Sequence, residues 1–490
     1  MSSDIKDDKS FEYNKEKLAE YDSEDNTSPK FVKSAEEKAF LKKLNWRVLP
    51  VVFLVIFIQF CDKSALTIAA VQGIRDDPML NVKMTDDQFA WLGSIFYLGF
   101  LICQVPNNYL IRKFPVGRYL GVTLFIWGIV MAATAACRTY SQLLALRFLL
   151  GLFEGVTYPC IYIVMNTLYR RSEQSACWGF LGVGTGMGTV FGVVIAYGLS
   201  YMEGIAGFRA WRWGYIVFGI LTVLISFITF FGLIDDPHHK LLRLTEKEKE
   251  IVAERARDNC VVRVYEIKRE QIWEAVKEPR LWLLVTANTL NCLQNGGLIV
   301  FSTLLVKGLG FSDFVSILLQ IPNGIAAASF AIGFVWIATR TKKIAFTAVA
   351  SSVVSLLGCV LMATITGTPK LAGFYLSWAM TGVGALIQTL VSNNVSGYTK
   401  RVFYNGMGMV AMTIGNFVGP LMMTGNQAPT YTGAMIGFSI SNVGIITCLF
   451  SVYFIMKRDN KRRLEHATTT ETDIYLDLTD KTDKNFVYKL

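Results

Sequence analysis

Twelve separated runs of apolar residues, each 18 residues or longer, constrain the fold of this chain more than any other feature. A helix of about 20 apolar residues is long enough to cross the hydrocarbon core of a bilayer. A soluble protein of 490 residues could hold two large cores, but it would not show twelve such runs. The sequence therefore predicts an all-α membrane protein with twelve transmembrane helices, at 47–71, 88–111, 119–137, 141–168, 175–200, 213–234, 280–306, 313–338, 343–366, 371–396, 403–425 and 430–456.

The net charge of +10 is distributed in a way that indicates membrane orientation and not a nucleic-acid partner. Basic residues gather in the two tails, in the 235–279 loop and in every second short loop, with loop 201–212 as a mild exception. Because Lys and Arg are enriched on the cytosolic side of membrane proteins, we expect both termini and the 235–279 loop in the cytosol. The basic residues of these short cytosolic loops are Arg112, Lys113, Arg118, Arg170, Arg171, Arg340, Lys342, Lys343, Lys400 and Arg401.

Two sequence matches at nearly the same offset indicate an internal repeat. Arg112 and Arg340 are 228 residues apart, and GTVFG, which starts at Gly188, matches GNFVG, which starts at Gly415, at an offset of 227. A parallel repeat of this kind is typical of transporters, in which the substrate site lies between the halves near the bilayer midplane. We therefore expect a cytosolic tail, a six-helix half, a cytosolic loop, a second six-helix half and a second cytosolic tail, at 1–46, 47–234, 235–279, 280–456 and 457–490.

The polar segments outside the spans carry two further expectations. The first 45 residues are rich in charged residues and serine and poor in apolar ones, which predicts a disordered tail. In the central loop, Thr245 and Glu248 have the spacing of a capping box, which predicts a charged surface helix that begins there.

The run 141–168 is apolar enough to cross a bilayer but contains two ionisable residues, Arg147 and Glu154. Seven helical residues make nearly two full turns, so both side chains lie on one face, about 10 Å apart along the axis. An ionised group near the bilayer centre costs at least ~2.5 kcal/mol, and it persists where it faces a cavity, a partner or a substrate. Two interpretations are open: a structural ion pair with a neighbouring helix, or a pathway in which the arginine binds an anion and the carboxyl carries a proton.

Polar residues in other spans extend this hypothesis. Asp62 and Lys63 are adjacent near the middle of the first span, about 100° apart on a helix, so each needs a separate partner or a wet face. Lys63 either neutralises an acid on another helix or binds a ligand. Amides of the later spans either bond neighbouring helices or line the cavity; they include Asn288, Asn291 and Asn295 on one face of span seven, then Gln320 and Asn394.

Several classes of function are disfavoured by what the sequence lacks. No Gly-Lys-Ser/Thr phosphate loop occurs in the sequence. The glycines of 182–188 do not have the spacing of a nucleotide-binding loop, and small residues spaced in this way favour close packing between membrane helices. No nucleophile arrangement or metal cluster is evident, and the adjacent His238 and His239 are poorly placed for one ion. We expect no enzyme activity, no metal and no cofactor other than a coupling proton.

The motifs CDKSALTIAAV, QVPNNYLIRKFPVGRYLG, RFLLGLFEGVTYP, SNNVSGYTKR and GNFVGP resemble those of the major facilitator superfamily. Within it, the chain resembles the fungal anion:cation symporters that include the allantoate permeases, over about 45–456. The resemblance implies the major facilitator fold and proton-coupled uptake of a small organic anion, such as allantoate, ureidosuccinate, nicotinate or pantothenate. Thiamine, biotin or cysteine transport, a facilitator without proton coupling and a transporter-like nutrient sensor are the alternatives.

The resemblance also assigns roles to residues of this sequence. The resemblance implies that Arg147 serves the anion and Glu154 the proton. The polar residues of the spans themselves supply further candidates: for the anion, Lys63, Asn288, Asn291, Asn295, Gln320 and Asn394; for the proton, Asp62. The basic loop residues Arg112, Arg118, Arg340, Lys400 and Arg401 are candidates for a gating or structural role. We expect a monomer in the plasma membrane.

Overall fold

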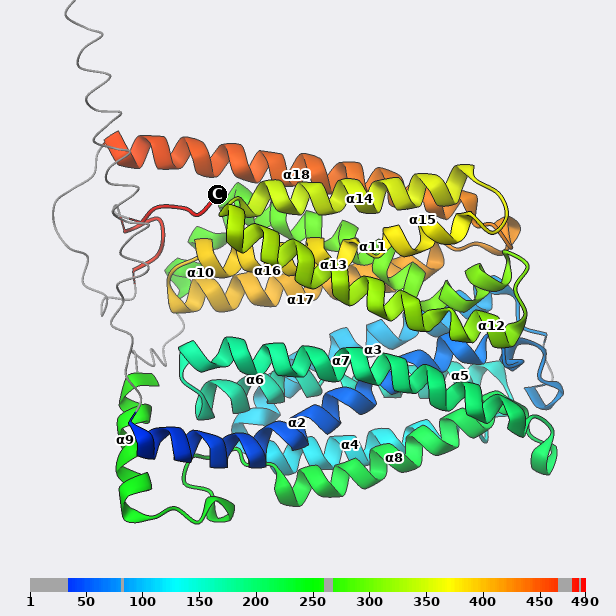
Figure 1. The fold of residues 1–490 in the computed structure, drawn as a ribbon, viewed down its shortest axis with the longest axis horizontal. Helices are drawn as coiled ribbons and strands as arrows, with labels where there is room; N and C mark the ends of the chain where they lie inside the picture. The colour runs from blue at the N-terminus through cyan, green and yellow to red at the C-terminus, as the bar shows by residue number, and fades with distance from the viewer. Residues whose placement is uncertain (1–33, 81–82, 260–267, 466–477, 484–485) are drawn as a thin grey trace, which may run out of the picture.

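Helices form almost all of the described chain, in the order of the predicted spans (Figure 1). The computed structural model describes residues 34–465 and 478–490, apart from 81–82, 260–267 and 484–485. The N-terminal half consists of α2 (Ala35–Ala69), α3 (Asp86–Lys113), α4 (Val116–Thr134), α5 (Tyr140–Glu154), α6 (Thr157–Leu168), α7 (Arg171–Leu199) and α8 (Ala210–Gly232). The C-terminal half consists of α11 (Pro279–Lys307), α12 (Asp313–Leu318), α13 (Gln320–Thr341), α14 (Ile344–Thr364), α15 (Lys370–Ser377), α16 (Met380–Asn394), α17 (Tyr398–Leu421) and α18 (Thr432–Glu465).

The remaining helices lie outside the predicted spans. The central loop contains α9 (Glu246–Asn259) and α10 (Arg269–Val276). The short 3-10 helices are η1 (Ile74–Asp76), η2 (Pro78–Leu80), η3 (Ser200–Met202), η4 (Ile205–Gly207), η5 (Lys240–Leu242) and η6 (Gly425–Gln427). Figure 1 shows α9, the start of α2 and the C-terminus at one end of the bundle, which we call the tail end; the opposite end is the loop end.

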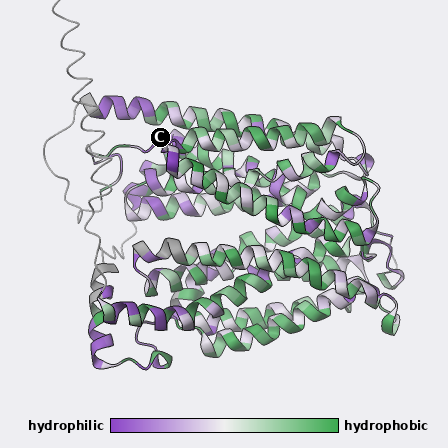
Figure 2. Ribbon diagram, in the orientation of Figure 1, coloured by the Kyte–Doolittle hydropathy of each residue, from purple (hydrophilic) through white to green (hydrophobic). Residues whose placement is uncertain are grey.

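The surface of the bundle has the character expected of helices in lipid. Figure 2 shows hydrophobic residues along the helices and hydrophilic residues concentrated at the tail end. Large apolar side chains such as Phe231, Ile332 and Ile440 are mostly exposed, which is typical of a membrane-facing surface. Among the described residues, ten helical stretches are long and apolar enough to cross a membrane. The predicted spans in α3 and α17 are not among them, and these two helices pack against each other between the halves.

Equivalent helices pack in the same way in the two halves. In the N-terminal half α7 lies against α2, and in the C-terminal half α17 lies against α11. A Cβ on Gly188 would lie 2.4 Å from the carbonyl oxygen of Phe57, and one on Gly415 would lie 2.5 Å from that of Thr289. Only glycine permits so close an approach. The matched segments of the sequence therefore make matched helix contacts, as the repeat predicts.

The glycine run in the middle of α7, at 182–188, is only partly a packing face. A Cβ on Gly184 would lie 3.1 Å from the ring of Phe53 in α2, whereas one on Gly182 or Gly186 would meet nothing within 4 Å. The expectation of close helix packing is therefore confirmed at Gly184 and wrong at Gly182 and Gly186.

Two spans predicted as continuous helices are interrupted because of proline, the span 141–168 near its middle and the span 313–338 close to its start. A proline has no N–H to donate and its ring crowds the carbonyl four residues earlier. Pro159 has this effect at Gly155, where α5 ends and α6 follows, and Pro322 has it at Leu318, the last residue of α12. The helix that carries Arg147 therefore ends at Glu154 itself.

The start of α2 corrects the expected N-terminal tail. Residues 35–45, predicted as disordered, form the first turns of α2. The hydroxyl of Ser34 caps the helix, and Lys43 forms an ion pair with Glu248 of α9, with 2.9 Å between Nζ and Oε2. Thr245 and Glu248 form the predicted capping box through N–H···O contacts of 2.8 and 3.4 Å. The central loop therefore stabilises the first helix, a contact that local sequence pattern does not reveal.

The end of the chain also differs from a free tail. Residues 457–465 continue α18, and the described part of 478–490 lies against the tail end of the C-terminal half. We call this part the C-terminal clasp. Its backbone exchanges hydrogen bonds with Asn394 and Asn460, and the carbonyl of Leu490 accepts the N–H of Ile344 at 2.9 Å.

A buried carboxylate of the clasp joins it to two membrane helices. Asp480 lies 2.7 Å from Nζ of Lys400 in α17 and 2.6 Å from Nη2 of Arg280 in α11, and all three groups are buried. Burial alone would raise the pKa of Asp480, but the charges of Arg280 and Lys400 outweigh it and hold this pKa below the usual value for aspartate. A carboxyl with a lowered pKa stabilises the fold above the ordinary aspartate pKa, and this stabilisation disappears as pH falls through the lowered value.

We expect Asp480→Asn to lower the thermal unfolding temperature of the purified protein at neutral pH, because it leaves two buried cations short of a counter-charge. Loss of one partner of a buried ion pair typically costs about 3 kcal/mol or more. The gap to wild type should narrow as pH falls below about 4. Asp459→Asn is the control, because the described residues form no ion pair with Asp459. Equal unfolding temperatures for both variants would contradict a stabilising role for the clasp.

Candidate functional site

Four ionisable side chains lie together in the middle of the N-terminal half, and we call them the charged cluster: Asp62, Lys63, Arg147 and Glu154. The first two lie on α2 and the other two on α5. Two cations and two carboxylates give a formal charge of zero. Asp62, Arg147 and Glu154 are buried, whereas the side chain of Lys63 is 25% exposed.

Glu154 and Lys63 form the central contact of the cluster. The Nζ of Lys63 lies 3.3 Å from Oε1 of Glu154, whose side chain is 1% exposed. The same oxygen accepts a hydrogen bond of 2.9 Å from Nε2 of Gln59, one turn earlier on α2. The carboxylate at the end of α5 is therefore held by two donors from α2, one charged and one neutral.

The other two members of the cluster contact aromatic residues on further helices. Oδ2 of Asp62 accepts a 2.6 Å hydrogen bond from the indole N–H of Trp127 in α4, while its Oδ1 is buried without a partner among the described residues. Arg147 donates to the hydroxyl of Tyr215 in α8, and its Cζ lies 5.3 Å from the ring centroid. As expected, Asp62 and Lys63 have separate partners.

A pocket beside the cluster reaches both halves of the protein. All four cluster residues line it, together with Tyr97 and Phe96 of α3 and Ile299 and Val300 of α11. The face of α5 that carries Arg147 and Glu154 also contains Gly151, where a Cβ would lie 1.8 Å from the carbonyl oxygen of Phe96. Gly151 thus brings α5 and α3 close enough for both helices to border one pocket.

The two halves are joined at the loop end, directly above the pocket. Oγ1 of Thr67, one turn after Lys63, lies 2.9 Å from Oγ of Ser302, and Thr303 donates to the carbonyl of Thr67. Farther out, the hydroxyl of Tyr431 donates to Asp86 at 3.0 Å. Every hydrogen bond between α2–α8 and α11–α18 that joins two described residues lies at this end. The pocket is therefore closed toward the loop end.

The predicted amide candidates separate into two groups. Asn291 is buried with Oδ1 unpaired among the described residues, and Asn295 is half-buried. Asn288 donates to the carbonyl of Gly408 at 2.9 Å, and Gln320 bonds within its own helix region, to Ser316 and Asn323.

Asn394 lies away from the pocket, at the tail end, where it holds the backbone of Lys489 in the clasp. Asn394 was expected to contact the substrate. It contacts the clasp instead, because α16 ends at Asn394 and the clasp covers this end of the helix.

The basic residues predicted in gating loops have different surroundings and contacts. The side chain of Arg112 lies outside the described residues; Arg118 is exposed, and Arg340 stacks over Trp336 at 5.5 Å. Arg401 donates to the carbonyl of Val395. Lys400 is fully buried among three carboxylates, those of Glu274, Glu278 and Asp480, at 2.5–2.7 Å. Its ammonium occupies the position that a metal ion would take among these acids.

Sequence reasoning missed three residues that contact the cluster: Gln59, Trp127 and Tyr215. Gln59 could have been found, because it lies on the same span as Lys63 and close to it in sequence. Trp127 and Tyr215 give no such signal, since aromatic residues are common throughout the spans and their partners are set by helix packing.

Comparison with known proteins identifies relatives over most of the chain. Residues 52–420 match the family model of the Major Facilitator Superfamily. The chain is 30% identical to the allantoate permease of Saccharomyces cerevisiae, over 97% of this chain and 89% of the permease. It is 29% identical to a thiamine pathway transporter of the same yeast, over 91% and 86% of the two chains. Its fold resembles that of a bacterial homologue of the human lysosomal transporter Spinster in an inward-facing, unoccupied conformation, with a TM-score of 0.64 and 15% identity, over 84% of this chain and 96% of that one.

We expect Gly151→Ala to destabilise the protein, because the new methyl group would collide with the α3 backbone and not with a flexible side chain. Overpacking of this kind typically costs about 1–3 kcal/mol. The readout is the thermal unfolding temperature of the purified protein. Gly186→Ala in α7 is the control, since its Cβ would meet nothing within 4 Å. A Gly151 variant as stable as this control would show that α5 and α3 need not approach so closely.

Proposed function

The chain belongs to the major facilitator superfamily of transporters, and from this premise we propose that it is a proton-coupled importer of a small organic anion. The observation that carries the proposal is the contact between Lys63 and Glu154. Lys63 is the exposed member of the charged cluster, and its counter-charge is a fully buried carboxylate. A cation that borders the pocket can bind an anion from it, and the anion must then compete with Glu154.

The competition supplies a physical basis for coupling. Once an incoming anion attracts Lys63, Glu154 stays buried with a weakened counter-charge, which is costly. Binding of one proton to Glu154 removes that cost and leaves the occupied cluster with a formal charge of zero again. A neutral occupied cluster can be enclosed by both halves with less desolvation penalty than a charged one. Asp62, whose Oδ1 has no partner among the described residues, is the second candidate for the proton.

The same geometry supports alternating access. Hydroxyl contacts such as Thr67 with Ser302 close the pocket toward the loop end, so entry from that side requires their separation. The distribution of basic residues supports a cytosolic location for the tail end. In this proposal the arrangement seen here releases substrate to the cytosol, the loop end faces the exterior of the plasma membrane, and a monomer performs the cycle.

The substrate is proposed as a class. The named relatives concern allantoate and the thiamine pathway, and an allantoate-like ureide, a vitamin carboxylate or an amino acid would each present a carboxylate to Lys63 and Arg147. Asn291, with its unpaired buried oxygen, and Asn295 are the amides that we retain as substrate contacts. Asn288, Gln320 and Asn394 bond within the C-terminal half and its clasp.

We expect Glu154→Gln to abolish the accumulation of substrate that a proton gradient drives, while the exchange of internal for external substrate stays measurable. Glutamine keeps the shape and the hydrogen bond of the side chain but cannot carry the proton. The assay is uptake of a labelled anion into proteoliposomes with an imposed pH difference. Glu36→Gln, the same change at an exposed carboxylate, should transport normally. Accumulation by the Glu154 variant would exclude this carboxyl as the coupling group, and pH-independent uptake by wild type would favour a facilitator.

We expect Arg147→Gln and Lys63→Gln each to raise the KM for anionic substrates far more than for neutral analogues. A hydrogen bond to a charged group is worth about 1.5–3 kcal/mol, which corresponds to a roughly 10- to 150-fold change in KM. The measurement is uptake kinetics with an acid and its uncharged amide. An equal loss for both substrates would mean that the cation is structural.

A further inference from the structure

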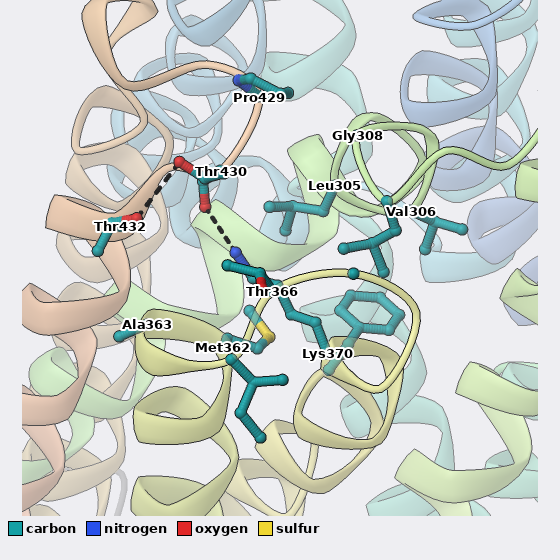
Figure 3. Close-up of a pocket in the computed structure, with 14 residues that line it drawn as sticks. Leu305, Val306, Gly308, Met362, Ala363, Thr366, Lys370, Pro429, Thr430 and Thr432 are labelled. Atoms are coloured by element: carbon teal, nitrogen blue, oxygen red, sulfur yellow. Dashed lines mark hydrogen bonds between the residues drawn. The ribbon is translucent and has the colours of Figure 1, made fainter.

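A second pocket opens at the loop end of the C-terminal half, separate from the charged cluster. The ends of α11 and α14, the start of α15 and the segment that leads into α18 surround it (Figure 3). Atoms leave about 670 Å³ free between these elements, including the open mouth. None of the residues that line this pocket lines the pocket beside Glu154. The second pocket is therefore a site separate from the proposed transport site.

The pocket contains one charged side chain, Lys370, the first residue of α15. This residue is only 6% exposed, and its Nζ donates to the carbonyl oxygen of Thr430 at 3.2 Å. An ammonium group has three N–H donors, so one carbonyl leaves it incompletely bonded. Among the described residues, no carboxylate lies within ion-pair distance of Lys370, and the lining of the pocket includes no Asp or Glu.

Several other buried cations of the described chain are paired with carboxylates. Arg212 lies 2.8 Å from Asp77, and Lys400 and Arg280 lie 2.7 and 2.6 Å from Asp480. These contacts follow the general rule that a buried charge needs a counter-charge. The ammonium of Lys370 contacts only the neutral carbonyl oxygen of Thr430 among the described residues, so this buried cation lacks a counter-charge.

We propose that this pocket binds a phosphate oxyanion, with Lys370 as its counter-charge. Two hydroxyl groups of the lining, on Thr430 and Thr432, lie 3.3 Å apart and can rotate to donate to such a ligand. Thr432 is also the first residue of α18, where the helix dipole favours negative charge. A dissolved anion and the phosphate of a lipid headgroup offer the same chemistry, and the loop end is accessible to both.

The test is thermal unfolding of the purified full-length protein in a nonionic detergent. Inorganic phosphate, exchanged for chloride at constant ionic strength, should raise the unfolding temperature of wild type in a saturable way. In a second arm, phosphatidylglycerol is compared with a diacylglycerol of the same chains, which lacks the phosphate. A response to phosphate alone identifies a dissolved anion, and a response to the phospholipid alone identifies a headgroup; either supports the site if it depends on Lys370.

Lys370→Gln should weaken the apparent affinity for the active probe about tenfold or more, as expected for loss of a charged partner. Lys307→Gln is the matched control, because it removes a lysine at the same end of the same half that already pairs with Asp313 at 2.6 Å. The same response in both variants, or no saturable response of wild type to either probe, would overturn the proposal.

A second variant keeps the test valid if Lys370→Gln fails to fold. Thr432→Asp introduces a carboxylate into the lining, at the first residue of α18. It should raise the unfolding temperature without any added anion and remove the response to phosphate, because the internal carboxylate replaces the ligand. A lower unfolding temperature together with an unchanged response to phosphate would contradict an oxyanion site.

Discussion

The need to compensate buried charge determines how the N-terminal half is assembled. Glu154 is held from α2, Asp62 is held from α4, and Arg147 is held from α8. The four charges of the cluster therefore connect four helices, α2, α4, α5 and α8, through contacts that a low-dielectric interior makes expensive to lose. A set of groups that is neutral when empty can accept an anion at low cost only if a positive charge accompanies it. Stability and the proposed coupling have the same origin.

Charge compensation within each half is compatible with the relative movement of the halves that the proposed function requires. At the tail end, Arg255 pairs with Glu37 and Glu173 inside the N-terminal half and the central loop, while Lys400 and Asp480 pair inside the C-terminal half and the clasp. Hydrogen bonds between described residues of the two halves are confined to the loop end. Bodies that are strongly joined internally and weakly joined to each other can rock as units around a site between them.

Hydropathy was sufficient to predict the helices because each span needs its own apolar surface, and proline chemistry at Pro159 and Pro322 would have located two of the interruptions. The site was predictable in part, since isolated charges in apolar runs must face something other than lipid. The partner of Lys63 was not predictable. Glu154 lies 91 residues farther along the chain, and only the way the helices around α2 and α5 are assembled decides that the two side chains meet. Asn394 shows a different limit of prediction from sequence. It lies in a motif that carries the family resemblance, but its side chain bonds the C-terminal clasp and not the pocket.

The exposure of Lys63 bears on the choice between a structural ion pair and a transport pathway. Arg212 and Asp77 show what a purely structural pair looks like in this protein: both side chains are almost completely inaccessible, and further carbonyl acceptors surround the arginine. In the Lys63–Glu154 pair the carboxylate is equally buried, but the cation keeps a quarter of its surface in the pocket. A partly exposed cation pays less desolvation than a buried one and can exchange its carboxylate partner for an anion that enters the pocket. One open partner beside one buried partner, both at the edge of the same pocket, lets a ligand reach the cation and compete with the acid for it.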